Sequence, residues 1–583
     1  MKKIFFTLFV LALSATSSSA KDRTEKEMQS IASKRLGLSI STMATKAVNT
    51  AVKKISESKQ LAVYNSKGRG FVVIAKDDDF APVLGYSDTD YDVDAIPCGL
   101  KWWMSQVEKS LEVRKAHAQT YQPAVYASST ATNFITTSWN QQAPYNTLCP
   151  EIDGVAAPTG CVATAMAQIM YYYKYPATSK GTGIYSVTTY KDKNDKEGTT
   201  KWYKRELGHT YEWTKMKNKY LRPTGDTDNA VATLMADAGA ASRMNYRAAA
   251  SGTIEWYAAK GFAENFRYDS LAISCLQRDF YTDAEWMEMV RKEMEAKQPV
   301  LYCGSDEIDG GHAFLLDGIQ EDGKVHVNWG WSGSGNGWYD INILHPKFYN
   351  GSALSSGNGF NIGQGMVCGF KKQETPSADE ENISQWITDG YSFYISNNEL
   401  HAKLTNAYNY SHRVFEGRLD VVLQGTGDNS KLYTDPIFET DTESPYVDML
   451  TGFEYGDSEN PEVDINLSQE PELKNISAGT YKLFIGSKST KEKAYQCLRS
   501  VGGTIMYTLA VAADGTMTLA QDGTSAISAV AVKHNISAPY TYIYNMQGQE
   551  VYKSKTQDFC LDDVPAHGVL IVKQGDTTRK VVK

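Results

Sequence analysis

The chain has 583 residues, enough for roughly three to four domains, and the composition of ordinary globular protein. Hydrophobic residues make up 42% of the chain and charged residues 22%, so there is ample material for buried cores. The net charge of −9, without a basic cluster to offset it, argues against nucleic acid as the main partner.

The N-terminus has the order of a secretory signal. Lys2 and Lys3 precede an apolar run, residues 4–13, and small residues follow up to Ala20. This order predicts a signal peptide over residues 1–20, cut after Ala20. The apolar run is too short for a mature membrane anchor, and no later stretch is apolar enough to replace it. We therefore expect a soluble protein, secreted or at the cell surface, with no transmembrane segment.

Residues 21–130 are expected to form a small α+β unit. Residues 61–78 predict two strands around a glycine turn, and residues 81–87 predict a further strand. A helix is expected from Cys98 to His117, with one apolar face made by Leu100, Trp103, Met104, Val107 and Leu111. Residues 121–133 are small and polar without a helical stripe, which is typical of an exposed linker that proteases cut.

The stretch Pro158–Pro176 places a cysteine at the start of an amphipathic helix. The helix face is predicted to consist of Val162, Ala165, Met166, Ile169, Met170 and Tyr173. We expect Thr159 to be the N-cap and Gly160 to allow another segment to approach closely. Cys161 then lies at the positive end of the helix, where the macrodipole and free N–H groups favour a thiolate. A thiolate is a nucleophile, although a buried structural cysteine is the ordinary alternative.

The rest of residues 131–374 mixes helices and strands. We expect loops over residues 191–208 and a helix over residues 283–297. Short strands are expected over residues 298–304, 312–319, 324–331, 337–344 and 365–370. A helix followed by an antiparallel sheet is typical of an α+β unit. Two glycine-rich loops, residues 330–337 and 351–365, are expected to be flexible turns or mobile walls of a substrate site.

After residue 375 the pattern becomes all-β. Strands such as residues 418–424 and 479–487 alternate with Gly, Asn and Asp turns, which predicts a β-sandwich over residues 375–522. Residues 523–583 contain two hairpin-like segments, residues 540–554 and 568–583. The eight cysteines are scattered and no close pair has metal-ligand spacing, so we expect neither a metal site nor a dense disulfide scaffold.

A catalytic thiolate needs a base, and two histidines are the main candidates. His312 follows Gly310 and Gly311 at the mouth of an apolar strand, where Gly311 would let a substrate backbone approach closely. His326 alternates with valines inside a strand, which is typical of a structural histidine. The pattern favours His312 as the base.

Three further residue types complete such a site. Asn328 could accept the N–H of His312 and fix its tautomer, and Trp329 could shield that hydrogen bond from water. Gln141 or its neighbour Gln142, about 20 residues before Cys161, could donate to an oxyanion together with the Cys161 N–H. The order Gln, Cys at a helix start, His and then Asn-Trp is that of papain-type enzymes.

Residues from about 139 to 370 resemble the streptopain family of secreted bacterial cysteine proteases. The resemblance rests on WNQQAPYNTLCP, APTGCVATAMAQIM, GGHAFLLDGI and HVNWGWSGSGNGWYDIN, and FVVIAKDDDFAPVLGYSD resembles the inhibitory propeptide of that family. It implies a papain-like fold with Cys161 as nucleophile, His312 as base, Gln141 in the oxyanion hole, and Asn328 and Trp329 behind the histidine. The final hairpins resemble the sorting domains of proteins exported by type nine secretion.

The sequence therefore predicts an α+β papain-like catalytic domain, in which a nucleophile helix packs on an antiparallel sheet. The expected divisions are a signal peptide (1–20), an inhibitory α+β propeptide (21–130), the catalytic domain (131–374), a β-sandwich (375–522) and a C-terminal β domain (523–583). We expect a zymogenic endopeptidase that acts on proteins or peptides, has its own propeptide as inhibitor and needs no cofactor. The alternatives are a Cys-His acyl transferase and a non-catalytic surface binding protein.

Overall fold

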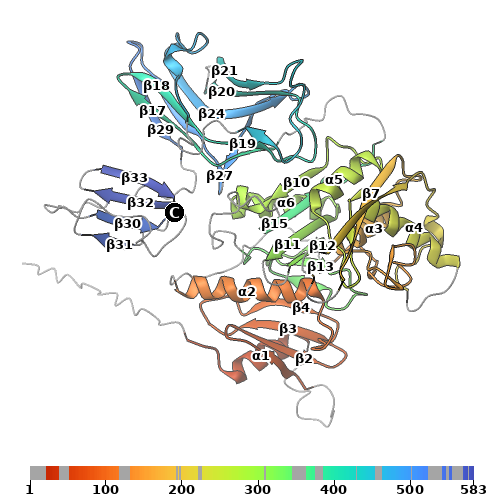
Figure 1. Ribbon diagram of the computed structural model, residues 1–583. Helices are drawn as coiled ribbons and strands as arrows, with labels where there is room; N and C mark the ends of the chain where they lie inside the picture. The colour runs from red at the N-terminus through yellow and green to blue at the C-terminus, as the bar shows by residue number, and fades with distance from the viewer. Residues whose placement is uncertain are drawn as a thin grey trace, which may run out of the picture.

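The computed structural model describes residues 21–37, 51–116, 132–191, 195, 198–220, 226–306, 310–344, 363–373, 385–427, 430–453, 463–500 and 502–522. It also describes the backbone of residues 541–545, 550–554, 569–574 and 577–582. The expected signal peptide and nearly all of the expected linker, residues 121–131, lie outside the described residues. We call residues 21–116 the N-terminal unit, residues 132–373 the middle unit and residues 385–522 the β-sandwich unit (Figure 1).

The N-terminal unit is the expected α+β unit. Its elements are α1 Glu25–Arg35, β1 Lys53–Glu57, β2 Leu61–Ser66, β3 Gly70–Ala75, β4 Val83–Ser87 and α2 Cys98–Ala116. The three strands and the helix predicted from the sequence are confirmed, and the predicted helix face is buried except for the half-buried Met104. Thr24 and Glu27 form a capping box that fixes the start of α1.

The middle unit contains the helix that begins at Cys161. Its elements are β5 Glu151–Ile152, β6 Val155–Ala156, α3 Cys161–Tyr173, β7 Thr182–Thr189, β8 Thr199–Glu206, η2 Trp213–Lys215, α4 Asp226–Ala241, β9 Asn245–Tyr246, α5 Glu255–Glu264, β10 Ser274–Gln277, η3 Arg278–Phe280, α6 Asp283–Glu295, β11 Val300–Asp306, β12 Gly310–Ile319, β13 Val325–Asn328, β14 Gly337–Tyr339 and β15 Gly363–Cys368. The predicted helices and the five predicted strands are confirmed.

Two expectations for this unit are wrong. Residues 199–206 form strand β8, paired with β7, rather than a loop. This strand is mostly exposed and so lacks the apolar alternation that marks a half-buried strand, but Arg205 pairs with the buried Asp237 of α4 at 2.7 Å. Thr159 is not the N-cap of α3, because Gly160 occupies that position and no side chain caps the helix. The Thr159 hydroxyl instead lies 2.8 Å from that of Thr164.

One antiparallel sheet joins the two units. The strand order is β1-β2-β3-β4-β14-β13-β12-β11-β15-β10, and the junction is the pairing of β4 with β14. Alternate residues of β12 face opposite sides, since Leu315 belongs to the core that includes α3, and Phe314 and Leu316 to the core that includes α2 and α6. The helices α3 and α2 therefore cover opposite faces of the same strands.

The β-sandwich unit is all-β, as expected. Its strands are β16 Trp386–Thr388, β17 Tyr391–Ser396, β18 Glu399–Leu404, β19 Ala407–Asn409, β20 Gly417–Gly425, β21 Leu432–Glu439, β22 Gly452–Phe453, β23 Val463–Asn466, β24 Gly479–Ser489, β25 Gln496–Cys497, β26 Arg499–Ser500, β27 Gly503–Thr504, β28 Tyr507–Val511 and β29 Met517–Gln521. Residues of three sheets share one apolar core, as in a sandwich. The final segment forms a four-stranded antiparallel sheet of two hairpins, with strands β30 Thr541–Asn545, β31 Glu550–Ser554, β32 Val569–Gln574 and β33 Thr577–Val582.

The β-sandwich unit contacts the middle unit through aromatic and arginine side chains. Trp256 of α5 is fully buried, donates to the Tyr410 carbonyl at 3.1 Å and packs edge-on against the Tyr410 ring. Arg499 donates to the Phe280 carbonyl at 3.0 Å and to Glu285 at 3.1 Å, and lies over the ring of Tyr281. This unit is therefore packed onto α5, η3 and the start of α6.

Candidate active site

Cys161 is the first residue of α3, and the local sequence fixes it there. Gly160 has φ +85, and a Cβ at this position would lie 2.6 Å from the Met244 side chain, so the turn before the helix requires glycine. Residues 162–171 are buried on all sides, which anchors α3 inside the middle unit. The sulfur of Cys161 is thus presented by a rigid helix whose first N–H groups have no partner within the helix.

His312 lies on β12, next to Cys161. Burial alone would raise the pKa of the Cys161 thiol, but the charge and hydrogen bond of His312, with the N–H groups of Ala313 and Val162, lower it below its ordinary value. Burial likewise opposes protonation of His312, yet the charge and hydrogen bond of Cys161 raise its pKa well above the ordinary value. Both shifts favour a thiolate–imidazolium pair, which we call the Cys161–His312 pair.

His326 is a structural residue. Its Nδ1 lies 2.5 Å from Oδ1 of the buried Asp317, and its ring packs edge-on against Trp338. The other oxygen of Asp317 accepts the Ile135 N–H at 2.8 Å. Asp317 of β12 therefore links His326 to Ile135, which lies near the start of the middle unit.

Asn328 is buried but does not bond His312 in this structure. Its Nδ2 donates to the Thr137 carbonyl at 2.7 Å and to Gln168 of α3 at 3.2 Å, and its Oδ1 accepts the Gly330 N–H at 3.0 Å. The expected hydrogen bond to the histidine is thus not met, because both ends of the amide are engaged elsewhere. Asn328 instead links β13, the strand next to that of His312, to α3.

Trp329 is buried beside His312. Its backbone carbonyl lies 3.3 Å from Nε2 of His312, and its indole N–H donates to the Gly335 carbonyl at 2.9 Å. The indole packs against Phe314 and Tyr339. The carbonyl of Trp329 therefore occupies the place expected for the Asn328 amide as the partner of the histidine ring.

Gln141 is buried, whereas Gln142 is exposed. The Thr159 N–H donates to the Gln141 carbonyl at 3.1 Å, which ties the Gln141 backbone to the residue two positions before Cys161. Gly311 is exposed and pairs with Ser305 on β11. Of the two glutamines, Gln141 is thus the one held against the segment that leads into α3.

The first turn of α2 packs against His312 and Trp329. The Sγ of Cys98 lies 3.1 Å from Nδ1 of His312. A Cβ on Gly99 would lie 2.3 Å from the His312 ring and 2.6 Å from the Trp329 ring, and a Cβ on Gly304 would lie 2.1 Å from the Trp102 ring. The N-terminal unit therefore fills the space in front of the histidine with no room for even a methyl group.

The N-terminal unit also holds the first glycine-rich loop, residues 330–337. Gly335 N–H donates to Thr89 at 2.9 Å, and Ser87 donates to the Asn336 carbonyl at 2.6 Å. The sequence alone did not identify Cys98, Gly99 or Thr89 as site residues, because they lie more than 200 positions before the residues that they contact. The only local signal was that Cys98 opens a predicted helix.

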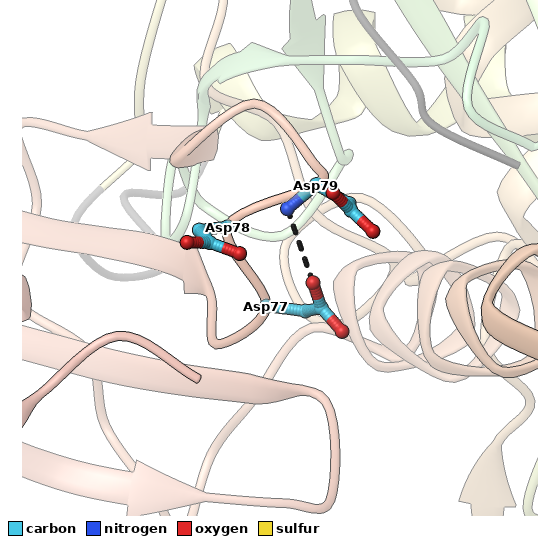
Figure 2. Close-up of side chains that lie close together, drawn as sticks. All are labelled: Asp77, Asp78 and Asp79. Carbon is cyan, nitrogen blue, oxygen red and sulfur yellow. Dashed lines mark hydrogen bonds between the residues drawn. The ribbon is translucent and has the colours of Figure 1, made fainter. Parts of the chain in front are cut away.

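Three consecutive carboxylates, Asp77, Asp78 and Asp79, lie close together in the N-terminal unit (Figure 2). Asp77 pairs with Lys115 at 2.7 Å and accepts the Asp79 N–H at 3.0 Å, and Asp78 accepts the Lys21 N–H at 2.8 Å. Asp77 and Asp78 thus link the end of α2 and residue 21 to the segment after β3. No helix in the described part of the chain is both long and apolar enough to cross a bilayer.

The comparisons with known proteins agree with this geometry. Residues 139–339 match the Peptidase C10 family, and residues 13–111 match the Spi protease inhibitor family. The thiol protease/hemagglutinin PrtT of Porphyromonas gingivalis is 31% identical over 395 residues, which are 64% of this chain and 44% of the relative. This chain thus spans less than half the length of that relative.

Streptopain of Streptococcus pyogenes is 29% identical over 391 residues, which are 62% of this chain and 95% of the relative. A solved fragment of Prevotella intermedia prointerpain A is 32% identical and covers 55% of this chain and 99% of its own length, with a TM-score of 0.47. Cys161 and His312 both lie inside the matched peptidase segment, and α2 lies inside the matched inhibitor segment. Through residues 139–339 the chain belongs to the Peptidase C10 family of thiol proteases, and a Spi-type inhibitor unit precedes this segment.

Proposed function

We propose that the chain is a secreted, zymogenic cysteine endopeptidase that hydrolyses proteins through a Cys161 thioacyl-enzyme. The observation that carries this proposal is the Cys161–His312 pair at the start of α3, where the pKa of the thiol is lowered and that of the imidazole raised. Such a pair supplies both the nucleophile and the acid that thiol proteolysis needs.

The reaction begins when the Cys161 thiolate attacks the carbonyl carbon of the scissile peptide bond. The oxyanion that forms is stabilised by the Cys161 N–H and the side-chain amide of Gln141, which is buried next to the segment before α3. His312 donates its proton to the leaving amine, so the peptide bond breaks and a thioester remains. His312 then takes a proton from water, which attacks the thioester and releases the second product.

In the full-length chain the N-terminal unit acts as an intramolecular inhibitor. The contacts of Cys98 and Gly99 with His312 and Trp329 support this, since a substrate cannot occupy the same space. Activation follows from cleavage between Tyr121 and Asn133, after which the N-terminal unit can leave β14 and the glycine-rich loop. Residues 1–20 direct export, and the two hairpins of residues 541–582 serve as a sorting signal.

The test is a casein digest with wild type, Cys161→Ala and His312→Ala, each after cleavage of the linker. Both variants are expected to lose nearly all activity, on the order of 10⁶-fold for loss of the nucleophile. His326→Ala serves as the matched histidine control, and it is expected to lose stability but keep substantial activity. Full activity of Cys161→Ala would refute the proposal, and an inactive but folded His326→Ala beside an active His312→Ala would reassign the base.

A further inference from the structure

Two cysteines from separate units meet at one histidine. Cys98 is the first residue of α2 and Cys161 the first residue of α3. The Sγ of Cys98 lies 3.1 Å from Nδ1 and 3.8 Å from Nε2 of His312, and Cys161 hydrogen-bonds the same ring. The His312 imidazole therefore interacts with one thiol of the N-terminal unit, Cys98, and one thiol of the middle unit, Cys161.

The residues around Cys98 keep it at this position. Gly99 packs on the rings of His312 and Trp329. On either side, Pro97 and Leu100 contact the Gly335 turn of the glycine-rich loop. The Cys98 backbone is thus held against the middle unit by its neighbours, while Cys98 itself is exposed.

These two thiols also differ from the other cysteines that the structure describes. All seven described cysteines are free thiols, and Cys98 is the one among them that is exposed. Burial raises the pKa of Cys275, Cys303 and Cys368 well above the ordinary value, which makes these thiols poor nucleophiles. A reagent that enters from solvent therefore meets the reactive Cys161 and the accessible Cys98 first.

We propose that Cys98 and Cys161 are an oxidative modification site, at which a small-molecule disulfide such as oxidised glutathione joins the inhibitor unit to the nucleophile. In the first step the Cys161 thiolate attacks one sulfur of the reagent, and the small thiolate that leaves takes the proton of the His312 imidazolium, which becomes neutral. In the second step the Cys98 thiol gives its proton to His312 and attacks the mixed disulfide at Cys161. A second equivalent of the small thiol leaves, so two protein thiols are oxidised and one reagent disulfide is reduced.

The consequence is a covalent lock on the zymogen, and this inference rests on the proposed function of Cys161. The Cys98 side chain must turn from His312 toward Cys161 to reach disulfide geometry. Once the bond has formed, the nucleophile is blocked and cleavage of the linker does not release the inhibitor unit. A thiol reductant restores both cysteines and allows the unit to dissociate.

The experiment uses the full-length chain with no change in sequence. The purified chain is incubated with oxidised glutathione, the remaining thiols are blocked, and disulfide-linked peptides are mapped by mass spectrometry. A peptide that joins Cys98 to Cys161 is expected. When the oxidised chain is then cut within residues 121–133, the two fragments should migrate together on a non-reducing gel and separately on a reducing gel. Separate fragments on the non-reducing gel, with only a glutathione adduct on Cys161, would overturn the inference.

Two variants test whether the cross-link requires Cys98. Cys98→Ser is expected to keep the glutathione adduct on Cys161 but to lose the cross-link, whereas Cys497→Ser, which changes a half-buried thiol of the β-sandwich unit, should cross-link like wild type. Cross-linking of Cys98→Ser to the same extent would also refute the assignment. Casein digestion by reduced, cut enzyme is measured in parallel. If the reduced, cut enzyme digests casein but the oxidised chain shows no cross-link, only the covalent lock is refuted. If the oxidised chain shows the cross-link but the reduced, cut enzyme does not digest casein, only the proteolytic function is refuted.

Discussion

At the scale of single residues, the chemistry of the site depends on how His312 alters Cys161. Burial would keep the thiol protonated, and the histidine reverses that effect. Cys149 in the same unit hydrogen-bonds Tyr246 instead of a histidine, and burial raises its pKa to about 12. The two cysteines thus provide an internal comparison of the same chemical group in two environments.

The first prediction concerns the pH dependence of alkylation. In the full-length chain, Cys161 should react with iodoacetamide at a pH below the ordinary thiol pKa of about 8.5, because its folded pKa is lowered and the thiolate persists as the pH falls. Without the imidazolium the burial penalty remains, so His312→Ala should move the midpoint to higher pH. Peptide mapping of the alkylated sites measures both midpoints, with Cys149 as the unreactive control. An unchanged midpoint in His312→Ala would show that the histidine does not lower the pKa of Cys161.

A second prediction separates the two neighbouring glutamines. Gln141→Ala should lower kcat about 10²- to 10³-fold with little change in KM, as expected for the loss of one donor to the oxyanion. Gln142→Ala is the matched control and should retain nearly normal kcat, because Gln142 is exposed. Steady-state kinetics on a peptide substrate decides between them. Equal kcat values for the two variants would leave the backbone N–H groups as the oxyanion donors.

At the scale of elements, the sequence predicted the helices and strands that a local apolar pattern marks. The apolar spacing of α3 and α2 and the apolar runs of β11 and β12 mark residues that face a core, and each of these elements forms as expected. Strand β8 was missed because its stability comes from pairing with β7, from stacking of Tyr203 on Tyr185 and from the Arg205–Asp237 ion pair. None of these contacts leaves a periodic mark in the sequence.

The features of the site divide in the same way, into residues that local signals mark and contacts that depend on packing. Cys161 and His312 could be predicted as partners because a cysteine at a helix start and a histidine beside a glycine pair are local signals, and the structure brings the two together. The bond of His312 to the Trp329 carbonyl and the engagement of Asn328 with Thr137 and Gln168 could not be found, since they depend on how α3 and β13 pack. The contact of Cys98 with His312 depends on the docking of two units and has no local signal.

A third prediction tests that docking at α2. Gly99→Ala places a Cβ where only 2.3 Å separates it from the His312 ring, so the first turn of α2 must shift away from the site. Alanine favours helix over glycine by roughly 0.5–1 kcal/mol, so a loss of inhibition in Gly99→Ala cannot be attributed to a weakened helix. The expected result is faster activation of the full-length chain and weaker inhibition, measured by the lag before casein digestion begins. Ser105→Ala, on the same helix, is the control and should keep the wild-type lag.

An unchanged lag in Gly99→Ala would show that the first turn of α2 is not what blocks the site. Circular dichroism of the variant should match wild type, which separates a local shift of α2 from unfolding of the N-terminal unit. Inhibition stronger than that of wild type would show that the helix gain outweighs the steric conflict.

At the scale of the whole molecule, the two faces of the ten-stranded sheet have different roles. One face is covered by α3, which begins at Cys161, and the opposite face receives α2 and α6. The N-terminal unit is therefore not a separate lid, because it continues the sheet of the middle unit through the pairing of β4 with β14. The β-sandwich unit instead contacts α5, η3 and the start of α6.

The last prediction concerns that contact of the β-sandwich unit. Arg499 uses its guanidinium in three ways at once: it donates to the Phe280 carbonyl, pairs with Glu285 and lies 4.0 Å from the centroid of the Tyr281 ring. The ion pair is partly exposed and contributes little, but the carbonyl bond and the stacked ring add to it. Arg499→Ala should therefore destabilise the middle unit by about 1–2 kcal/mol, because Glu285 also caps α6 with Thr282.

Thermal unfolding of the full-length chain measures this change as a fall in the midpoint of the transition that exposes Trp256 and Trp286. Arg499→Lys keeps the charge but loses the planar fork that reaches carbonyl, carboxylate and ring together, so it should restore only part of the stability. Lys431→Ala is the control, because the hydrogen bond of Lys431 to Ser477 stays within the β-sandwich unit. If Arg499→Ala left the transition of the middle unit unchanged, the β-sandwich unit would be an independent module that is only tethered to the peptidase. A lowered transition would mean that the peptidase depends on this unit for its stability, and that removal of residues 385–522 would weaken the enzyme itself.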